Sequence, residues 1–141
     1  MSPDYVAGLI DGEGHIGVNK VTRRNGRPQY QIRVQIGNTE PGLMQPIMAA
    51  FGGSWSVVEA QRWNKNARTC HKWQIHSRQA QRFILAILPH LRHPGKIKAA
   101  KACLMMEFLR KKAGGNKIDD VRVITSECLR EIVLSANSGN Y

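Results

Sequence analysis

The sequence lacks a long apolar run, a secretion signal and any close pairing of its few cysteines. No apolar run is long enough to span a bilayer, so we expect no membrane-spanning helix. The opening residues Met1 to Asp4 carry no basic region followed by an apolar stretch, as a secretion signal would. Cys70, Cys103 and Cys128 lie far apart and form no Cys-x-x-Cys pair, which disfavours disulfides and zinc. We therefore expect an intracellular, soluble protein with reduced thiols.

Acidic residues are also scarce. The 141 residues include 21 Lys and Arg but only 10 Asp and Glu, which gives a net charge of +11. Such an excess in a chain of one-domain size points to a polyanionic partner, either nucleic acid or an acidic membrane surface. Of these two, we expect nucleic acid as the partner and no membrane. The charge is unevenly distributed, because residues 1–14 carry Asp4, Asp11 and Glu13 and no base, whereas residues 15–78 carry a net +8. A short acidic opening is thus followed directly by a basic region.

Local signals predict an α+β domain with the element order αββαββα, followed by further helices. Ser2 and Pro3 are typical of a helix start, and Asn25-Gly26 is typical of a hairpin turn. We expect one domain over 1–141, with a core at about 2–110 and a C-terminal helical extension at about 111–141. Its four strands should form one antiparallel sheet that is covered by helices on one face. The expected helices cover about 2–11, 40–51, 77–88, 94–113 and 125–135, and the expected hairpins cover 15–37 and 54–77.

The second strand of the first hairpin alternates strictly between apolar and polar residues. Tyr30, Ile32, Val34 and Ile36 should face the core, and the intervening Gln and Arg side chains should face solvent. Amides and guanidinium groups in such a row can make paired hydrogen bonds to base edges in a DNA major groove. An ordinary solvated sheet face would show the same alternation. The residues expected to contact DNA are His15, Asn19, Arg23, Arg24, Arg27, Gln29, Gln31, Arg33, Gln35, Arg62, Lys65, Arg68, Lys72, Gln74 and His76.

The opening helix carries two glycines four residues apart, Gly8 and Gly12. Each glycine costs a helix roughly 1 kcal/mol relative to Ala, so a helix that keeps two on one face usually needs close backbone approach there. Apolar Val6, Leu9 and Ile10 surround this surface. The pattern predicts tight packing against another helix.

The segment from Val6 to Gly14, Val-Ala-Gly-Leu-Ile-Asp-Gly-Glu-Gly, resembles the motif of the LAGLIDADG homing endonucleases, with Val for Leu, Gly for Ala and Glu for the second Asp. Together with the element order, the resemblance covers roughly residues 2–110. Relatives with one motif copy act as homodimers whose motif helices pack on the two-fold axis. The resemblance therefore implies a dimer interface that includes Val6, Ala7, Gly8, Leu9, Asp11 and Gly12.

The same resemblance implies a divalent-metal site at the end of the motif. The family's metal ligand falls on Glu13, with the carbonyl of Gly12 as a second oxygen donor for Mg²⁺ or Mn²⁺. Lys96-Ile97-Lys98 is similar to a Lys-apolar-Lys segment of single-motif relatives, whose second lysine lies near the active site, which implies a catalytic role for Lys98. Asn38 takes the place of a polar residue that holds water near the metal, and Asp11 is expected to be structural.

The activity implied by the resemblance is a metal-dependent double-strand cut in a long, near-palindromic DNA site, made by an intron-encoded homing endonuclease. Some relatives assist intron splicing as RNA maturases, which would make intron RNA a partner, and some bind DNA without cutting it. A DNA-binding regulator that uses the same sheet without metal is a further alternative. Synthesis in a bacterial or archaeal cytoplasm, or in the organelle that encodes the protein, fits the absence of a targeting peptide.

Overall fold

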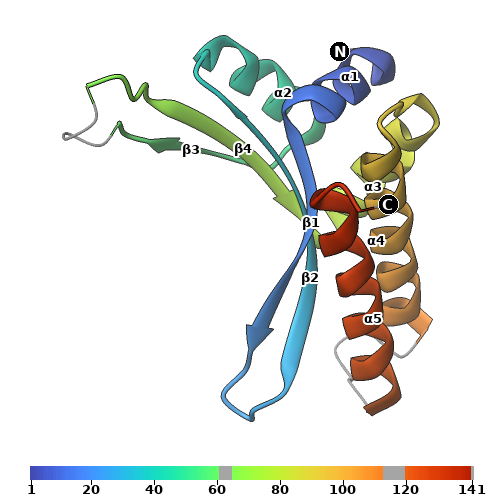
Figure 1. Cartoon of the computed structure of the whole chain (residues 1–141). Helices are drawn as coiled ribbons and strands as arrows, with labels where there is room; N and C mark the ends of the chain where they lie inside the picture. Colours follow the sequence, from blue (N-terminus) through green and yellow to red (C-terminus); the bar gives the residue numbers. More distant parts are fainter. Residues whose placement is uncertain (61–64, 113–119, 141) are drawn as a thin grey trace.

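Two β-hairpins, each preceded by a helix, form one four-stranded antiparallel sheet in the computed structural model (Figure 1), which describes residues 1–60, 65–112 and 120–140. The strand order β1-β2-β4-β3 places β2 and β4 at the centre of the sheet. The α+β architecture and element order predicted from the sequence are confirmed. The helices are α1 (Pro3–Glu13), α2 (Met44–Phe51), α3 (Ser77–Ile87), α4 (Pro94–Lys112) and α5 (Asp120–Asn137), and the strands are β1 (Gly14–Thr22), β2 (Pro28–Asn38), β3 (Ser54–Val58) and β4 (Cys70–His76).

Helix α1 begins and ends where local chemistry dictates. The Ser2 hydroxyl accepts a hydrogen bond from the Tyr5 amide at 3.3 Å, and Pro3 occupies the first turn. The helix ends at Glu13, because the C-cap residue Gly14 has an extended backbone. Gly14 must be glycine, because a Cβ there would lie 2.6 Å from the Cα of Ile10. Since β1 starts at Gly14, the last residues of α1 lie directly at the entry to the sheet.

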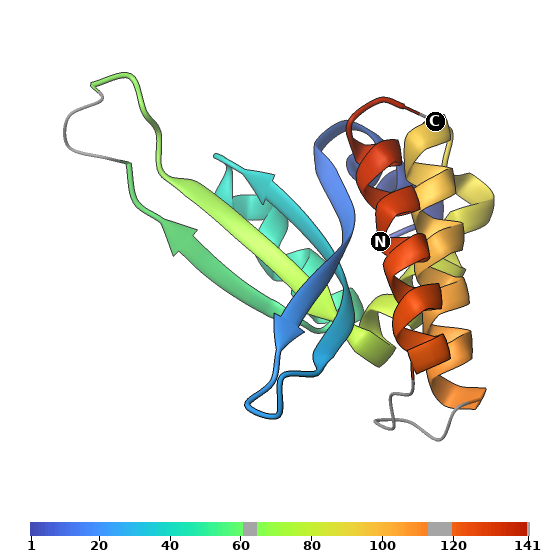
Figure 2. The same cartoon turned by 60° about the horizontal axis from the view of Figure 1, so that its bottom comes forward.

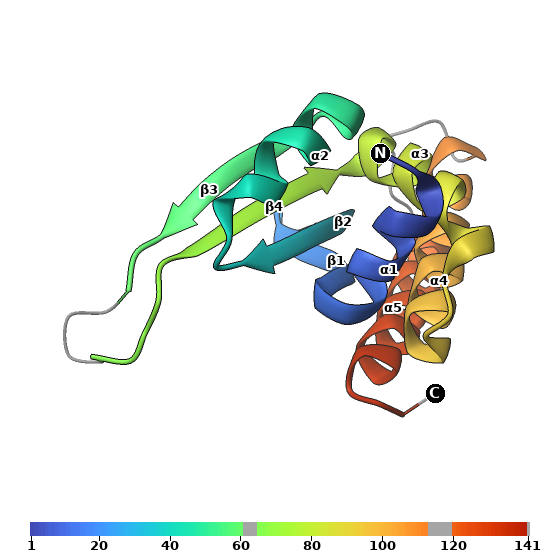
Figure 3. The same ribbon diagram turned by 90° about the horizontal axis from the view of Figure 1, so that it is seen from above.

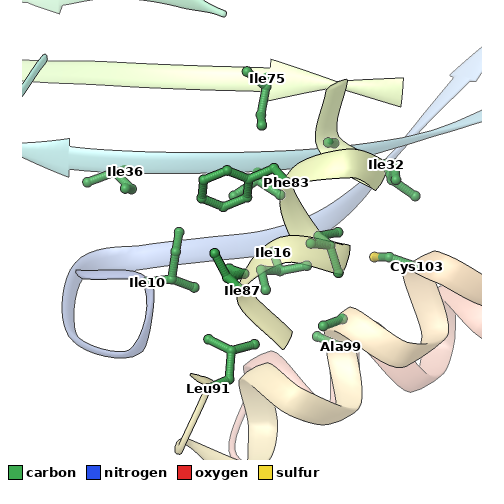
Figure 4. Packing of buried hydrophobic residues seen from close by; sticks show 14 of the residues in the cluster. Ile10, Ile16, Ile32, Ile36, Ile75, Phe83, Ile87, Leu91, Ala99 and Cys103 are labelled. Carbon is green, nitrogen blue, oxygen red and sulfur yellow. The ribbon is translucent and has the colours of Figure 1, made fainter. Parts of the chain in front are cut away.

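The core lies between one face of the sheet and the helices. Ile32 and Val34 from β2 are fully buried, as are Trp73 from β4 and Ile84 from α3. Figure 4 shows side chains from α1, β1, β2, β4 and α3 converging on this space. Figure 2 shows α4 and α5 side by side on one side of the sheet, and Figure 3 shows α1 beside β1 and β2. The helical layer therefore covers one sheet face and leaves the other open, as predicted.

The C-terminal helices differ in detail from the sequence prediction. Helix α5 begins at Asp120 rather than at Thr125 or Ser126, and the Thr125 hydroxyl donates to the Val121 carbonyl inside the helix. Phe108 of α4 is a large apolar residue, but it is 59% exposed. The buried face of α4 instead carries Ala99, Cys103 and Met106 among its members, and the small Ala and Cys side chains permit close approach to β1. Val133 and Ala136 of α5 join the same core.

No helix within the described ranges combines the length and apolar character needed to cross a membrane. The three cysteines are free thiols.

Candidate functional site

Helix α1 has a buried face and an open face. Val6, Ala7 and Ile10 are completely buried in the core of their own chain, whereas Gly8 and Gly12 are exposed. A Cβ at either exposed glycine would meet nothing within 4 Å. The chain by itself therefore has no steric need for these two glycines, unlike Gly14. Glycines at i and i+4 lie on one face of a helix, and such an open face permits close approach of another helix.

This geometry corrects the expected dimer interface. Val6 and Ala7 have no exposed surface and cannot form it, because they pack toward the sheet. Gly8, Gly12 and the partly buried Leu9 remain accessible. Asp11 is partly buried, and its two carboxylate oxygens accept hydrogen bonds from the backbone amides of Arg92 and His93 at 2.8 and 3.2 Å. Asp11 thus ties the end of α1 to the segment before α4, which agrees with the structural role expected for it.

Glu13 is the exposed acid at the end of α1, and Gly12 beside it is also exposed. Because both Asp11 oxygens are engaged, Glu13 is the motif acid left for a ligand. Among the described residues, no group of three or more His, Cys, Asp and Glu could hold a metal ion. Mg²⁺ is commonly bound through one or two carboxylates, with water and substrate phosphate completing its shell. The Glu13 carboxylate and the Gly12 carbonyl are hard oxygen donors that fit this pattern.

A lysine does reach this end of α1, but it is the first lysine of the Lys-apolar-Lys segment. Lys96 Nζ donates to the carbonyl of Gly14, whereas Lys98 is exposed. Residues two apart on a helix point about 200° away from each other, so both lysines cannot face α1. Burial lowers the pKa of Lys96, and the Asp11 carboxylate opposes that lowering. The structure therefore places Lys96, rather than Lys98, beside the motif.

Asn38 takes up a different position from the one expected. The alternation of β2 places it on the same face as Ile36, which is the core side of the sheet. Its side-chain oxygen accepts a hydrogen bond from the Glu40 amide at 2.9 Å and so stabilises the turn after β2. Gln35, on the open face, is paired instead with His15, two residues beyond Glu13.

The open face of the sheet carries the polar residues that the alternation predicted. Strand pairing places His15, Gln35 and Gln74 in one row across β1, β2 and β4, and Gly17, Arg33 and His76 in the next row. Further from Glu13 lies the pair of Asn19 and Gln31, and Lys72 lies beyond Gln74 on β4. We call this surface the polar sheet face. It starts at His15, so Glu13 lies at its edge.

Two buried polar atoms on the polar sheet face have no hydrogen-bond partner among the described residues. They are Arg33 Nε and Gln35 Oε1, on neighbouring rows of β2. Native structures contain few such atoms, and water, an ion or another molecule can satisfy them. A donor and an acceptor of this kind match the edges of DNA bases.

Burial, with nearby positive charge, lowers the pKa of the two histidines on this face. Burial, Lys96 and Arg33 lower the pKa of His15, and burial and Arg33 lower the pKa of His76. Both imidazoles are therefore neutral at pH 7, and each can donate one hydrogen bond and accept another.

The lowered histidine pKa values predict an acid-sensitive stability. Below the ordinary pKa of 6.5, the unfolded chain takes up protons that His15 and His76 resist in the folded chain. The free energy of unfolding should therefore decrease as the pH falls from 6.5 to 5. The double variant His15→Gln/His76→Gln should show a flatter decrease, measured as urea midpoints across this range. Equal slopes for the two proteins would contradict the assignment.

The remaining expected DNA contacts lie at the ends of the hairpins. Arg23, Arg24 and Arg27 are exposed around the β1–β2 turn, where Gly26 adopts a positive φ of 77°. Lys65 and Arg68 are exposed between β3 and β4. Arg62 lies outside the described residues.

Several contributions to the site carried no clear sequence signal. A cavity of about 310 Å³ beside the end of α1 is lined by Gly12, Lys96 and residues at the C-terminal end of α5. There the Asn137 amide donates to the Ile16 carbonyl of β1 at 2.9 Å. His90 and His93 have the spacing of metal ligands, but each contacts its own chain. His90 Nδ1 lies 2.6 Å from Asp4 Oδ1, and His93 Nδ1 accepts a hydrogen bond from the Gly95 amide at 3.1 Å.

No family model and no curated protein matches this sequence. Solved structures do match it. The homing endonuclease I-CvuI in complex with the I-CreI target has a TM-score of 0.74 at 17% identity, covering 95% of this chain and 80% of that chain. The meganuclease I-SmaMI bound to uncleaveable DNA has a TM-score of 0.75 at 13% identity, covering 92% of this chain. The LAGLIDADG homing endonuclease I-LtrWI bound to target DNA has a TM-score of 0.70 at 15% identity, covering 93% of this chain.

This chain spans 44% of I-SmaMI and 43% of I-LtrWI, so it corresponds to less than half of each. At these identities the similarity is one of fold. The chain has the fold of the LAGLIDADG homing endonucleases, which confirms the resemblance first indicated by the segment from Val6 to Gly14.

Proposed function

We propose that this chain, with its LAGLIDADG fold, is a site-specific DNA endonuclease that makes a metal-dependent double-strand cut as a homodimer. The observation that carries the proposal is the position of Glu13, an exposed carboxylate at the end of α1 and at the edge of the polar sheet face. Glu13, an acid that could hold a metal, therefore lies next to the polar sheet face, a surface that could contact DNA bases.

DNA binding is supported by charge and by unsatisfied polar groups. The chain carries a net +11, which favours contact with a polyphosphate backbone. Arg33 Nε and Gln35 Oε1 have no hydrogen-bond partner among the described residues and lie on the open face of the sheet. I-CvuI, I-SmaMI and I-LtrWI are bound to DNA in the matching structures. The salt dependence of binding should accordingly be steep.

The dimer proposal rests on α1. One motif copy provides one Glu13, and the open glycine face allows a second α1 to approach closely. A two-fold axis along this helix pair would bring two Glu13 side chains together and call for a near-palindromic target.

A divalent ion such as Mg²⁺ or Mn²⁺, held by Glu13 and the Gly12 carbonyl, would activate water and offset negative charge at the phosphate. The chain's own groups define the rest of the site. Lys96, fixed by the Gly14 carbonyl, brings positive charge to this end of α1, where it could stabilise charge that develops on the phosphate. Asp11 positions the end of α1 against the segment that leads into α4.

The cleavage assay begins with selection of bound duplexes from a random library. A selected site is cloned into a supercoiled plasmid and incubated with the protein and Mg²⁺. The proposal expects linear product that is absent when EDTA is added. Tight binding without any cut in Mg²⁺ or Mn²⁺ would refute the enzyme proposal and leave a DNA-binding protein.

Substitution of Gly8 tests the dimer. In Gly8→Leu the new side chain meets open space in the single chain, so the chain should fold normally but lose close approach of a second α1. We expect sedimentation equilibrium to report a dimer for wild type and a monomer for the variant, with similar melting temperatures. Ala86→Leu, on the exposed surface of α3, is the control and should remain dimeric. A wild-type monomer in the presence of target DNA would refute the homodimer.

A further inference from the structure

A second basic surface lies on the helical side of the sheet, away from the polar sheet face. A cavity of about 340 Å³ separates the β1–β2 turn from α4 and α5, and Figure 1 shows the hairpin diverging from α5 there. Arg23 and Arg27 line it from the hairpin, and Arg110 and Arg122 line it from the helices. Tyr30, whose side chain is on the core side of β2, also lines it. The proposed cleavage chemistry assigns no role to this cavity.

The described residues that line the cavity include no acid. Two of its guanidinium groups are held through Nε alone. Arg110 Nε contacts Glu107 at 2.9 Å, and Glu107 is only 2% exposed. Arg23 Nε donates to the Gln29 side-chain oxygen at 2.9 Å. These contacts orient both side chains and leave their terminal nitrogens for another acceptor, in the fork geometry that matches phosphate oxygens.

The acid next to this cavity, Glu127, already has hydrogen-bond and ion-pair partners within the chain. Glu127 follows the lining residue Ser126 and is bound by the Tyr30 hydroxyl at 2.6 Å, by Lys20 at 2.9 Å and by Arg130 at 3.0 Å. The bonds from Tyr30 and Lys20 lower the pKa of Glu127 to about 2. Burial and Glu127 together raise the pKa of Tyr30 to about 12, so its hydroxyl stays neutral. The floor of the cavity therefore adds no uncompensated negative charge.

We infer that this cavity is a phosphate-binding site, separate from the polar sheet face, that takes a backbone phosphodiester of a nucleic acid or a free phosphate ester. Arginines converge on it from two independent parts of the fold, which is how a tetrahedral oxyanion is held from several sides. Its volume accommodates a phosphate group with several waters, since a water takes up about 30 Å³ in the liquid. The inference does not depend on cleavage.

Inorganic phosphate and pyrophosphate are the first probes, added at constant ionic strength with chloride as the reference. Phosphate should raise the melting temperature of wild type by more than chloride does. Arg122→Gln should weaken phosphate affinity about tenfold, the cost of one charge-assisted hydrogen bond. Arg27→Gln, on the opposite wall, should do the same. Arg82→Gln, an exposed arginine on α3, is the matched control and should keep wild-type affinity. Arg110 is left intact because its removal would leave Glu107 buried without its partner.

A second measurement identifies the source of the phosphate. Binding of a selected duplex and of the same duplex with extended ends is followed against salt concentration. If the phosphate belongs to nucleic acid, Arg122→Gln should reduce the salt slope by about 1 for the extended duplex only. If both slopes stay unchanged while phosphate affinity falls, the ligand is a free phosphate ester. Equal stabilisation of wild type by phosphate and chloride, or undiminished phosphate affinity in both cavity variants, would overturn the inference.

Discussion

Replacing Glu13 with Gln should abolish cleavage of a bound target while leaving its binding nearly unchanged. Glu13 is exposed and makes no hydrogen bond to the rest of the described chain that would be lost, so folding should not suffer. The amide keeps the size of the side chain but loses the charge that a divalent ion requires. We expect the single-turnover cleavage rate to fall by about three orders of magnitude, comparable to the loss of a strong transition-state stabiliser. Nicking and linearisation of a supercoiled plasmid measure this directly.

The control for Glu13→Gln is Glu131→Gln, which removes an exposed acid from α5 and should cut like wild type. Asp11→Asn gives a different signature. Its carboxylate accepts two backbone hydrogen bonds, so this variant should lower the melting temperature as well as activity. If Glu13→Gln cleaves the plasmid at the wild-type rate, the assignment of Glu13 as metal ligand is wrong even if the protein is a nuclease.

Elements governed by short-range chemistry were predictable from the sequence. Ser2 and Pro3 start α1 because a hydroxyl acceptor and a fixed φ suit a helix N-terminus. The period-2 pattern of β2 fixes which of its residues are buried, so Ile32 and Arg33 lie on opposite faces as expected. In both cases the determining interactions join residues that are close in sequence.

Which face of a helix is buried depended on packing that the sequence does not display. Val6 and Gly8 both belong to the motif, yet only the structure shows that Val6 packs into its own chain and Gly8 stays open. Phe108 is exposed for a related reason. The sheet and α5 pack against the face of α4 that carries small residues, and the larger side chain of Phe108 lies outside that face. The predicted start of α5 is too late because Thr125 has the character of a helix cap, whereas its hydroxyl bonds within the helix and the acidic Asp120 lies in the first turn.

The two lysines of α4 differ in their position relative to the motif. The family resemblance implied a catalytic role for Lys98, whereas it is Lys96 that contacts the Gly14 carbonyl at the end of the motif. Lys96→Met keeps most of the apolar length of the side chain but removes the charge beside the proposed reaction centre. We expect the single-turnover rate to fall about a hundredfold to a thousandfold with target affinity nearly unchanged, because the charge would act on the transition state rather than on binding.

Lys98→Met is the matched control, with the same change two residues along the same helix. Its exposed side chain points away from α1, so the cleavage rate should stay within a fewfold of wild type. Melting temperatures separate loss of charge from loss of the Gly14 contact, since a purely structural role for Lys96 would lower stability and leave the rate of the folded protein unchanged. The opposite ranking, with Lys98→Met inactive and Lys96→Met active, would mean that DNA binding rearranges the start of α4. In that case the contact between Lys96 and Gly14 would belong to the free protein and not to the reacting complex.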